Sequence, residues 1–340
     1  MRKILIGILL FPGFQLLDIA GPRDAFGEVR ALGEGQYDIV TVSTTRNPLR
    51  SACGLTVIAD RSIFEPCPFF DTLIVPGGVG VFDVYEDPRL VAWLGRQFKR
   101  CRRLAAVCNG VFALGGAGLL DHRRVTSHWA DAARLRAAFP QVRVCAESIR
   151  LKDGPLYTSA GVSASIDLAL LLIEEDFGRK MALRVAKYLL VYLERPGGQS
   201  QFRPLVDRQA HGDAHVQAVR EYVAANLQQP HSLASLAERV HMSPRNLTRL
   251  FSKQTGITPM AFVNDARIDA ARELLETTEL PVGAVAARCG IDSADNLRRV
   301  FSKRLGLSPL EYRQRFQAVR AHPGHPAGAG ELPAPLLSDA

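Results

Sequence analysis

The first 193 residues alternate short apolar runs with segments of helical periodicity. Buried strands that alternate with helices are typical of a parallel sheet covered by helices on both faces, so the pattern predicts an α/β domain over residues 1–193. Helices are predicted at 17–32 and 88–102, and one long apolar helix at about Ser163–Leu193. Four runs are predicted to be strands: Ile4–Leu9, Asp38–Val42, Thr72–Val75 and Leu104–Val107.

The pattern breaks at Glu194-Arg195-Pro196-Gly197-Gly198, where proline and glycine cannot continue a helix. Residues 194–213 are therefore predicted to be a linker. Residues 214–316 then show helical periodicity only, which predicts an all-α domain. Beyond residue 316 the chain is rich in Ala, His, Pro and Gly, a composition that cannot build a core. Residues 317–340 are accordingly predicted to be a disordered tail.

The all-α domain contains an internal repeat, because Leu236–Ser243 parallels Val285–Asp292. The offset between the copies is 49 residues before a turn and 50 residues after it, so one copy has a residue inserted in the turn. Each copy has a short helix, a capped turn and a second helix with apolar residues at i, i+3 and i+4. The cap is Ser243 in the first copy and either Asp292 or Ser293 in the second. The repeat predicts two helix-turn-helix motifs.

The exposed face of each second helix has the residue types that read DNA. A helix fits the major groove, where arginine forms two hydrogen bonds with guanine, and lysines near the helix ends suit phosphates. Asp295 is less expected there; it either accepts a bond from a cytosine amino group or orients an arginine. For any one arginine the alternative is a solvated surface position, but two copies of one geometry favour DNA binding. The predicted DNA contacts are Arg245, Thr248, Arg249 and Lys253 in the first motif, and Asp295, Asn296, Arg298, Arg299 and Lys303 in the second.

Residues 215–316 resemble the AraC-type DNA-binding domain, and the stretch from Arg267 to Pro309 matches its signature at most positions. The resemblance implies seven helices, with the two recognition helices in successive segments of the major groove about one turn of DNA apart. It also implies double-stranded operator or promoter DNA and RNA polymerase as partners.

The α/β domain contains a candidate nucleophile. The strand Leu104–Val107 enters a helix through the tight turn Cys108-Asn109-Gly110. The dipole of a following helix favours a thiolate, which would activate Cys108. Pro76-Gly77-Gly78 follows another strand and offers backbone N–H groups to an anion. Taken singly, a lone cysteine is usually a small core residue, and the glycine pair is usually an ordinary turn.

Two further residues complete the candidate site. Asp18 follows the first strand among apolar neighbours, and His128 lies in Thr126-Ser127-His128-Trp129. The alternatives are a helix cap for Asp18 and a packing role for His128. The candidate catalytic pair is Cys108 with Asp18. The predicted ligand-binding residues are Asp18, Gly77, Gly78, Cys108, Asn109 and His128.

In this order, these features resemble the PfpI-like (class I glutamine amidotransferase-like) superfamily, which implies a flavodoxin-like, doubly wound parallel sheet. The nearest enzyme type is similar to isocyanide hydratase, which has an acid at the position of Asp18 and a cysteine at that of Cys108. PfpI-type peptidases and deglycases have a histidine where this chain has Asn109, which counts against those activities. The order of the two domains resembles the GlxA-like branch of AraC-type regulators. That resemblance implies a homodimer whose first domain senses a small nitrogenous metabolite.

Composition adds limits to this interpretation. The chain is 47% hydrophobic and 22% charged, values that suit globular domains, and its net charge of +8 is compatible with a polyanionic partner. None of its six cysteines has a spacing typical of zinc ligands, so they are predicted to be reduced thiols in a cytoplasmic protein without a metal or cofactor. No apolar run reaches the roughly 18 residues that a membrane span needs.

Three hypotheses remain at this point. The favoured one is a sequence-specific transcriptional regulator, an activator that responds to a small nitrogenous effector. The second is a cysteine-dependent hydratase or hydrolase with a DNA-binding tail. The third is an architectural DNA-binding protein without a ligand, which would leave the turn at Cys108 unexplained.

Overall fold

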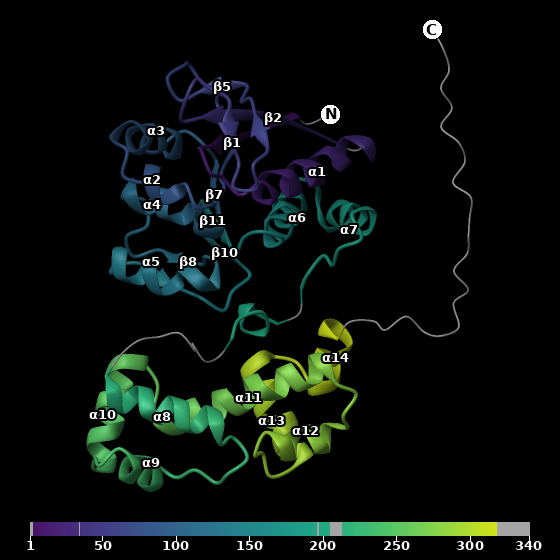
Figure 1. The fold of residues 1–340 in the computed structure, drawn as a ribbon. Helices are drawn as coiled ribbons and strands as arrows, with labels where there is room; N and C mark the ends of the chain where they lie inside the picture. The colour runs from purple at the N-terminus through teal and green to yellow at the C-terminus, as the bar shows by residue number, and fades with distance from the viewer. Residues whose placement is uncertain (1–2, 34, 196, 205–212, 318–340) are drawn as a thin grey trace. The chain divides into compact units, whose positions relative to one another are not determined.

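The chain divides into two compact units, Met1–Arg203 and Pro204–Ala340. The computed structural model describes residues 3–33, 35–195, 197–204 and 213–317 (Figure 1). Residues 197–203, which the sequence pattern assigned to the linker, belong to the first unit. Glu194, Arg195, Pro204 and Asp213 of the predicted linker are also described, whereas residues 196 and 205–212 lie outside the described residues, as does the predicted tail from residue 318 onward.

The first unit is built on a seven-stranded sheet in the order β10-β11-β7-β6-β1-β2-β5. All neighbouring strands are parallel except β10 and β11, which form an antiparallel hairpin at one edge. The central strands β6 and β7 are buried at every position, as expected for a sheet covered on both faces. The strands are β1 (Lys3–Leu10), β2 (Gln36–Ser43), β5 (Arg61–Ser62), β6 (Thr72–Val75), β7 (Arg103–Val107), β10 (Arg150–Asp153) and β11 (Leu156–Ser159).

Helices cover both faces of this sheet, with α1, α6 and α7 on one side and α2, α3 and α4 on the other (Figure 1). The doubly wound fold and the four predicted strands are confirmed. The bounds are α1 (Leu17–Ala31), α2 (Val81–Val84), α3 (Pro88–Phe98), α4 (Val111–Gly116), α5 (Ala132–Ala138), α6 (Ala164–Phe177) and α7 (Arg179–Tyr188). Two short pairs lie outside the sheet: β3 (Leu49–Arg50) with β4 (Thr56–Val57), and β8 (Arg124–Val125) with β9 (Arg143–Val144).

The predicted single helix over Ser163–Leu193 is wrong. Gly178 adopts φ +84° and separates α6 from α7, and α7 ends at Tyr188. A glycine at positive φ ends a helix at little steric cost. The apolar pattern therefore continues from α6 into α7 although the helix is interrupted between them.

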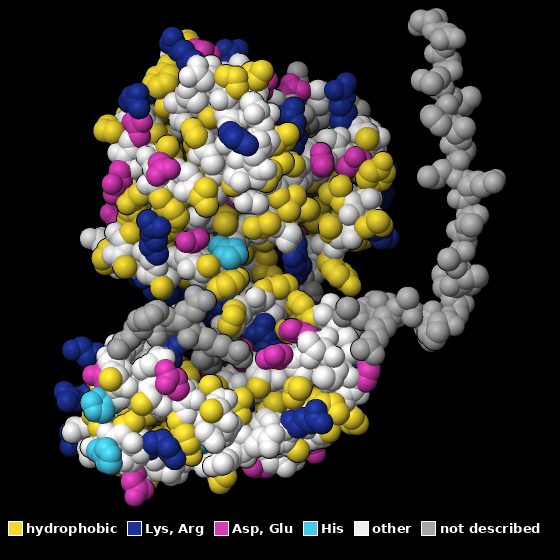
Figure 2. Space-filling view, in the orientation of Figure 1, with side chains coloured by type: hydrophobic (Ala, Val, Ile, Leu, Met, Phe, Trp, Pro, Cys, Tyr) yellow, Lys and Arg dark blue, Asp and Glu magenta, His cyan; other side chains and the backbone are white. Residues whose placement is uncertain are grey.

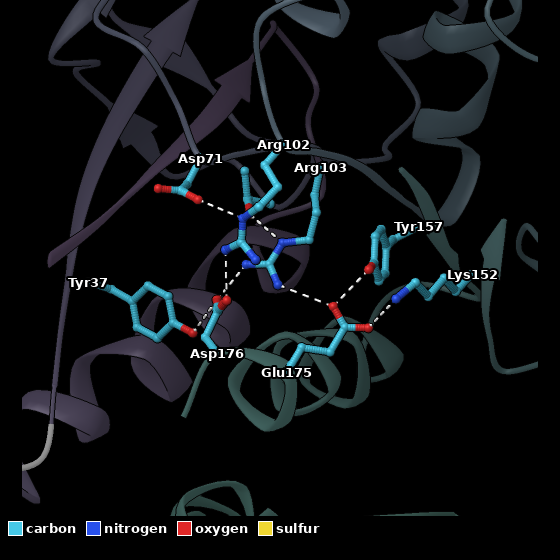
Figure 3. Close-up of polar contacts among 9 residues, drawn as sticks. Tyr37, Asp71, Arg102, Arg103, Lys152, Tyr157, Glu175 and Asp176 are labelled. Atoms are coloured by element: carbon cyan, nitrogen blue, oxygen red, sulfur yellow. Dashed lines mark hydrogen bonds and ion pairs between the residues drawn. The ribbon is translucent and has the colours of Figure 1, made fainter. Parts of the chain in front are cut away.

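An ionic network lies at the amino ends of the strands and joins α6 to the sheet (Figure 3). Asp176, near the end of α6, has a fully buried side chain and accepts hydrogen bonds from Tyr37 (2.9 Å), Arg102 (2.7 Å) and Arg103. Glu175 extends the network to the hairpin strands. It accepts hydrogen bonds from Tyr157 and Lys152, both at 2.7 Å.

The second unit consists of seven helices over its described residues, the number that the AraC-type resemblance implies. The long helix α11 contributes Phe262 and Val263 to one small core and Ile268, Ala271 and Leu275 to another. A single helix therefore joins two separate cores. The helices are α8 (Ala214–Ala225), α9 (Leu233–Arg239), α10 (Pro244–Thr255), α11 (Pro259–Thr277), α12 (Val282–Arg288), α13 (Ala294–Leu305) and α14 (Pro309–Phe316).

Candidate functional site

The first helix-turn-helix motif is formed by α9 and α10. The turn between them contains His241 at φ +52° and ends at Ser243, whose hydroxyl accepts a hydrogen bond from the backbone N–H of Asn246 at 3.3 Å. Leu247 and Phe251 face the core and are fully buried. Pro244 occupies the first helical position, where the missing N–H costs nothing.

The second motif, formed by α12 and α13, repeats this geometry. Gly290, at φ +69°, stands where the first motif has His241. The helix cap is Ser293, whose hydroxyl accepts from the N–H of Asn296 at 3.1 Å, so Asp292 is the inserted residue of the turn. Leu297 and Phe301 are fully buried in the second core.

The predicted DNA-contacting side chains of α10 project outward. Arg245, Arg249 and Lys253 are exposed, and neither arginine has a partner among the described residues of the chain. Thr248 is partly buried, and its hydroxyl donates to the carbonyl of Pro244 at 2.9 Å. The two arginines therefore keep their full hydrogen-bonding capacity for another molecule.

The corresponding side chains of α13 are paired along the helix. Arg298 contacts Asp295 at 2.5 Å, and Arg299 donates to the side-chain oxygen of Asn296 at 2.8 Å. Asp295 thus takes the orienting position that was one of its two predicted roles, and its side chain remains 88% exposed. Lys303 is exposed and forms no such pair with any described residue.

On the face of the second unit that Figure 2 shows, charge is not gathered into one patch. Lys and Arg side chains lie among hydrophobic and acidic ones across the visible face (Figure 2). Arg304, near the end of α13, pairs at 2.7 Å with Asp265, a buried residue of α11. Arg304 therefore ties α13 to α11 inside the unit.

In the first unit, Cys108 occupies the predicted sharp turn between β7 and α4. Its backbone adopts φ +57°, a conformation that L residues rarely take, and its side chain is buried. Gly161 lies directly against it: a Cβ atom built on Gly161 would stand 2.2 Å from the Cβ of Cys108. Only glycine allows this approach.

Asp18, in the first turn of α1, lies in the same buried cluster. Its two carboxyl oxygens accept backbone hydrogen bonds, one from Gly77 and one from Val162, each at 2.8 Å. Burial raises the pKa of Asp18 to about 7, although both hydrogen bonds act to lower it. The carboxyl group is therefore half protonated near neutral pH.

The backbone amides predicted to bind an anion are already engaged within the protein. Gly77 donates its N–H to Asp18, and Gly78 donates its N–H to the side-chain oxygen of Asn109 at 2.8 Å. The glycine loop therefore serves to bind the neighbouring side chains, and its two amides are not open donors for a ligand.

The expected activation of Cys108 is also opposed by its surroundings. Burial, followed by the nearby carboxyl of Asp18, raises the pKa of the Cys108 thiol well above its usual range. Desolvation of the thiolate outweighs the favourable dipole of α4, a helix of only six residues. The neutral thiol is the stable form at neutral pH.

A pocket of about 190 Å³ lies beside this cluster, and His128 is the only member of the predicted ligand set that lines it. Gly161, which contacts Cys108, also lines the pocket. The other walls include Trp129, Gln199 and Phe202, which the sequence interpretation did not single out. Gln199 and Phe202 had been assigned to the linker, and no local pattern marks that segment as part of a site.

A substitution at Asp18 tests the protonation of the buried cluster. An acid whose pKa is raised in the folded state stabilises the fold below its unfolded pKa, and this stability is lost as the pH rises through about 7. The wild-type free energy of unfolding should fall, by on the order of 4 kcal/mol, between pH 4 and pH 7 from this group alone. In Asp18→Asn this contribution should disappear.

Urea unfolding followed by tryptophan fluorescence measures this difference, because both tryptophans, Trp93 and Trp129, belong to the first unit. Other acids are common to the two proteins, so the difference between them isolates Asp18. Parallel pH profiles for wild type and variant would show that folding does not raise the pKa of Asp18.

The described part of the chain has neither a metal-ligand cluster nor a membrane-spanning helix. Over residues 3–33, 35–195, 197–204 and 213–317, no three His, Cys, Asp or Glu side chains are placed to hold a metal ion. Over the same ranges, no helix has both the length and the apolar character that crossing a bilayer requires.

Known protein families match both units of the chain. The profile of the DJ-1/PfpI family matches residues 2–175, and that of a helix-turn-helix domain matches residues 236–315. The chain is 30% identical over 335 residues to the HTH-type transcriptional regulator GbdR of Pseudomonas aeruginosa, which covers 98% of this chain and 88% of that protein.

Other relatives share the first unit. The isonitrile hydratase of Pseudomonas putida is 38% identical over 176 residues, which covers 51% of this chain and 72% of that enzyme. A crystal structure of a THiJ/PfpI family protein from Pseudomonas syringae is similar with a TM-score of 0.51 and 25% identity, over 66% of this chain and 87% of that one. With the match to GbdR along its length, the chain belongs to the helix-turn-helix transcriptional regulators that combine an N-terminal DJ-1/PfpI domain with a C-terminal AraC-type DNA-binding domain.

Proposed function

We propose that this regulator binds operator DNA with α10 and α13 and activates transcription in response to a small nitrogenous metabolite bound by its first unit. The observation that carries the proposal is the repeated motif geometry. Two recognition helices, capped alike by Ser243 and Ser293, are joined by one continuous helix, α11. A rigid pair of this kind suits two successive segments of the major groove.

The side chains on these helices divide by their chemistry. Arg245, Thr248 and Arg249 on α10 are proposed to contact bases, and Lys253 a phosphate. On α13, Asp295 and Asn296 hold the two arginines beside them in place, which favours a fixed geometry at the base edges. The proposed contacts of α13 are Asp295, Asn296, Arg298, Arg299 and Lys303.

A homodimer is part of the proposal, and exposed apolar side chains on the first unit support it. Tyr188, Leu190 and Tyr192, at and after the end of α7, are 65%, 93% and 76% exposed. Apolar groups gathered on a surface are typical of protein contacts. We place the protein in the cytoplasm, where its free cysteines would stay reduced.

Transcript mapping tests the direction of regulation. In cells that lack the protein, genes beside its binding sites should lose transcripts, and recruitment of RNA polymerase to those promoters should fall. Wild-type protein should restore both, whereas the double substitution Arg249→Ala/Arg299→Ala should not. Increased transcripts at the bound promoters in the deletion strain would make the protein a repressor.

A hydratase activity is a second candidate, which the strained Cys108 and the isonitrile hydratase relative favour. A group with a pKa of about 7, such as Asp18, also suits proton transfer at neutral pH. The raised pKa of the thiol and the engaged amides of Gly77 and Gly78 oppose it, so we propose that the chain is not an enzyme. Turnover of an isocyanide by wild type, lost in Cys108→Ala, would overturn this part of the proposal.

A further inference from the structure

Gln199, which lines the pocket beside Cys108, has a buried acceptor without a partner among the described residues. The side-chain N–H groups of Gln199 donate to the carbonyls of Ser127 and Ser148, both at 2.9 Å, and to the hydroxyl of Thr126 at 3.1 Å. Since the two carbonyls only accept, they fix the orientation of the amide. The oxygen of Gln199 is then left buried with no hydrogen-bond partner in the described structure. An unpaired buried acceptor is costly, so a donor that reaches it is favoured.

His128, another residue that lines the pocket, has a donor. The Nδ1 atom of His128 accepts a hydrogen bond from the N–H of Ala130 at 3.3 Å, so the neutral ring carries its proton on Nε2. Burial lowers the pKa of His128, which keeps the ring neutral at neutral pH. A ligand with both an N–H and a carbonyl group therefore finds a partner for each.

A carboxylate has no comparable partner there. Arg195, the cation that lines the pocket, contacts the carboxyl of Asp167 at 2.9 Å and donates to the hydroxyl and carbonyl of Ser163 at 3.1 and 3.0 Å. Its charge is neutralised by these contacts. The remaining walls include the rings of Trp129 and Phe202, which suit a short apolar body.

One wall of the pocket is the segment that leads toward the second unit. Residues 197–203, here called the strap, are held on the first unit through Glu147. The backbone carbonyl of Glu147 accepts a hydrogen bond from the N–H of Gln199 at 3.0 Å. The carboxyl of Glu147 accepts from the N–H of Ser200 at 3.1 Å and pairs with Arg203. The next residue, Pro204, begins the second unit.

We propose that this pocket binds a small carboxamide, whose N–H donates to Gln199 and whose carbonyl accepts from His128, and that binding stabilises the strap. The volume of about 190 Å³ limits the ligand to about the size of an amino acid. This inference rests on the proposed function, because it identifies the effector site and the segment through which occupancy reaches the DNA-binding unit.

Three small molecules with the same carbon skeleton test the site in the full-length protein: butyramide, n-butylamine and butyrate. Binding is followed by fluorescence, since Trp129 lines the pocket whereas Trp93 is buried in α3. Butyramide should bind at least about tenfold more tightly than butyrate, which leaves the buried acceptor unpaired. It should also slow hydrogen exchange at the amides of Gln199 and Ser200.

Phe202→Ala should weaken butyramide binding about tenfold, because it removes an apolar wall. Phe202 is 45% exposed, so the substitution should leave the fold intact, and Phe69→Ala, at a 54% exposed position, is the matched control. Equal or tighter binding of butyrate, or no saturable response to butyramide, would overturn the site. If n-butylamine binds as tightly as butyramide, His128 is not the donor to the ligand carbonyl. If butyramide leaves hydrogen exchange in the strap unchanged, binding does not stabilise the strap.

These outcomes are separate from those for the proposed function. Specific binding of operator DNA is measured without any of the three probes. Absence of specific DNA binding would contradict the proposed function but would say nothing about the pocket. Failure of butyramide to bind would contradict the pocket but would say nothing about DNA recognition.

Discussion

Replacing both Arg249 and Arg299 with alanine should abolish specific DNA binding by this protein, with an affinity loss of about 100-fold or more. A good arginine contact to a base contributes about 1–3 kcal/mol, and one such contact is expected from each recognition helix. Arg249 is exposed, and Arg299 is exposed and held by Asn296 at 2.8 Å. Fluorescence anisotropy with a bound genomic fragment and excess competitor DNA, at physiological salt, measures the loss.

A matched control separates base reading from the general effect of positive charge. Arg315→Ala removes an exposed arginine on α14, outside both helix-turn-helix motifs, and should change specific affinity by less than about threefold. Lys253→Ala should weaken specific and nonspecific binding alike and reduce the salt dependence by about one phosphate contact. If the double variant still prefers its site over competitor DNA, α10 and α13 do not read the sequence.

The second large effect concerns stability. Asp176→Asn should destabilise the first unit by about 3–5 kcal/mol, because it removes the buried partner of a buried cation. Asp176 has a fully buried side chain, and that of Arg103, its ion-pair partner, is only 3% exposed. The substitution keeps the size of the side chain but leaves the guanidinium of Arg103 without its full countercharge. Urea unfolding monitored by tryptophan fluorescence reports on this unit alone.

Asp71→Asn is the control for this variant. Asp71 also contacts Arg102 at 2.7 Å, but both side chains are partly exposed, and such pairs contribute about 1 kcal/mol or less. Although burial raises the pKa of Asp176, the hydrogen bonds from Arg103 and Arg102 lower it below its usual value. The stability it contributes is therefore present above about pH 4 and is lost as the pH falls further. If Asp176→Asn and Asp71→Asn destabilise the first unit equally, the buried ion pair of Asp176 with Arg103 is not the source of the lost stability.

The sequence predicts those elements whose signals are local and repeated. The central strands were found because each is a short apolar run, and the two motifs because one pattern occurs twice. The break at Gly178 was missed because buried apolar residues occur in both α6 and α7, and a glycine alone does not reveal its φ. The edge hairpin, β10 with β11, has no continuous apolar run to mark it.

The candidate site shows a different limit. The sequence correctly grouped Asp18, Gly77 and Cys108, since each follows a strand whose carboxyl end lies at the same edge of the sheet. It could not show that these groups satisfy one another, because a hydrogen bond such as that from Gly77 to Asp18 joins residues 59 positions apart. Gln199 was overlooked for a related reason: a segment rich in Gly and Gln gives no sign that it packs against a distant pocket.

Selection of genomic DNA tests the central claim most directly. The purified protein is incubated with fragments of its own genome at physiological salt with excess competitor, and the retained fragments are sequenced. The account predicts a few sites, each with paired elements about 10 base pairs apart, one for α10 and one for α13. The Arg249→Ala/Arg299→Ala variant should not enrich them. Retention without a shared sequence, or the same sites recovered by the variant, would contradict the account.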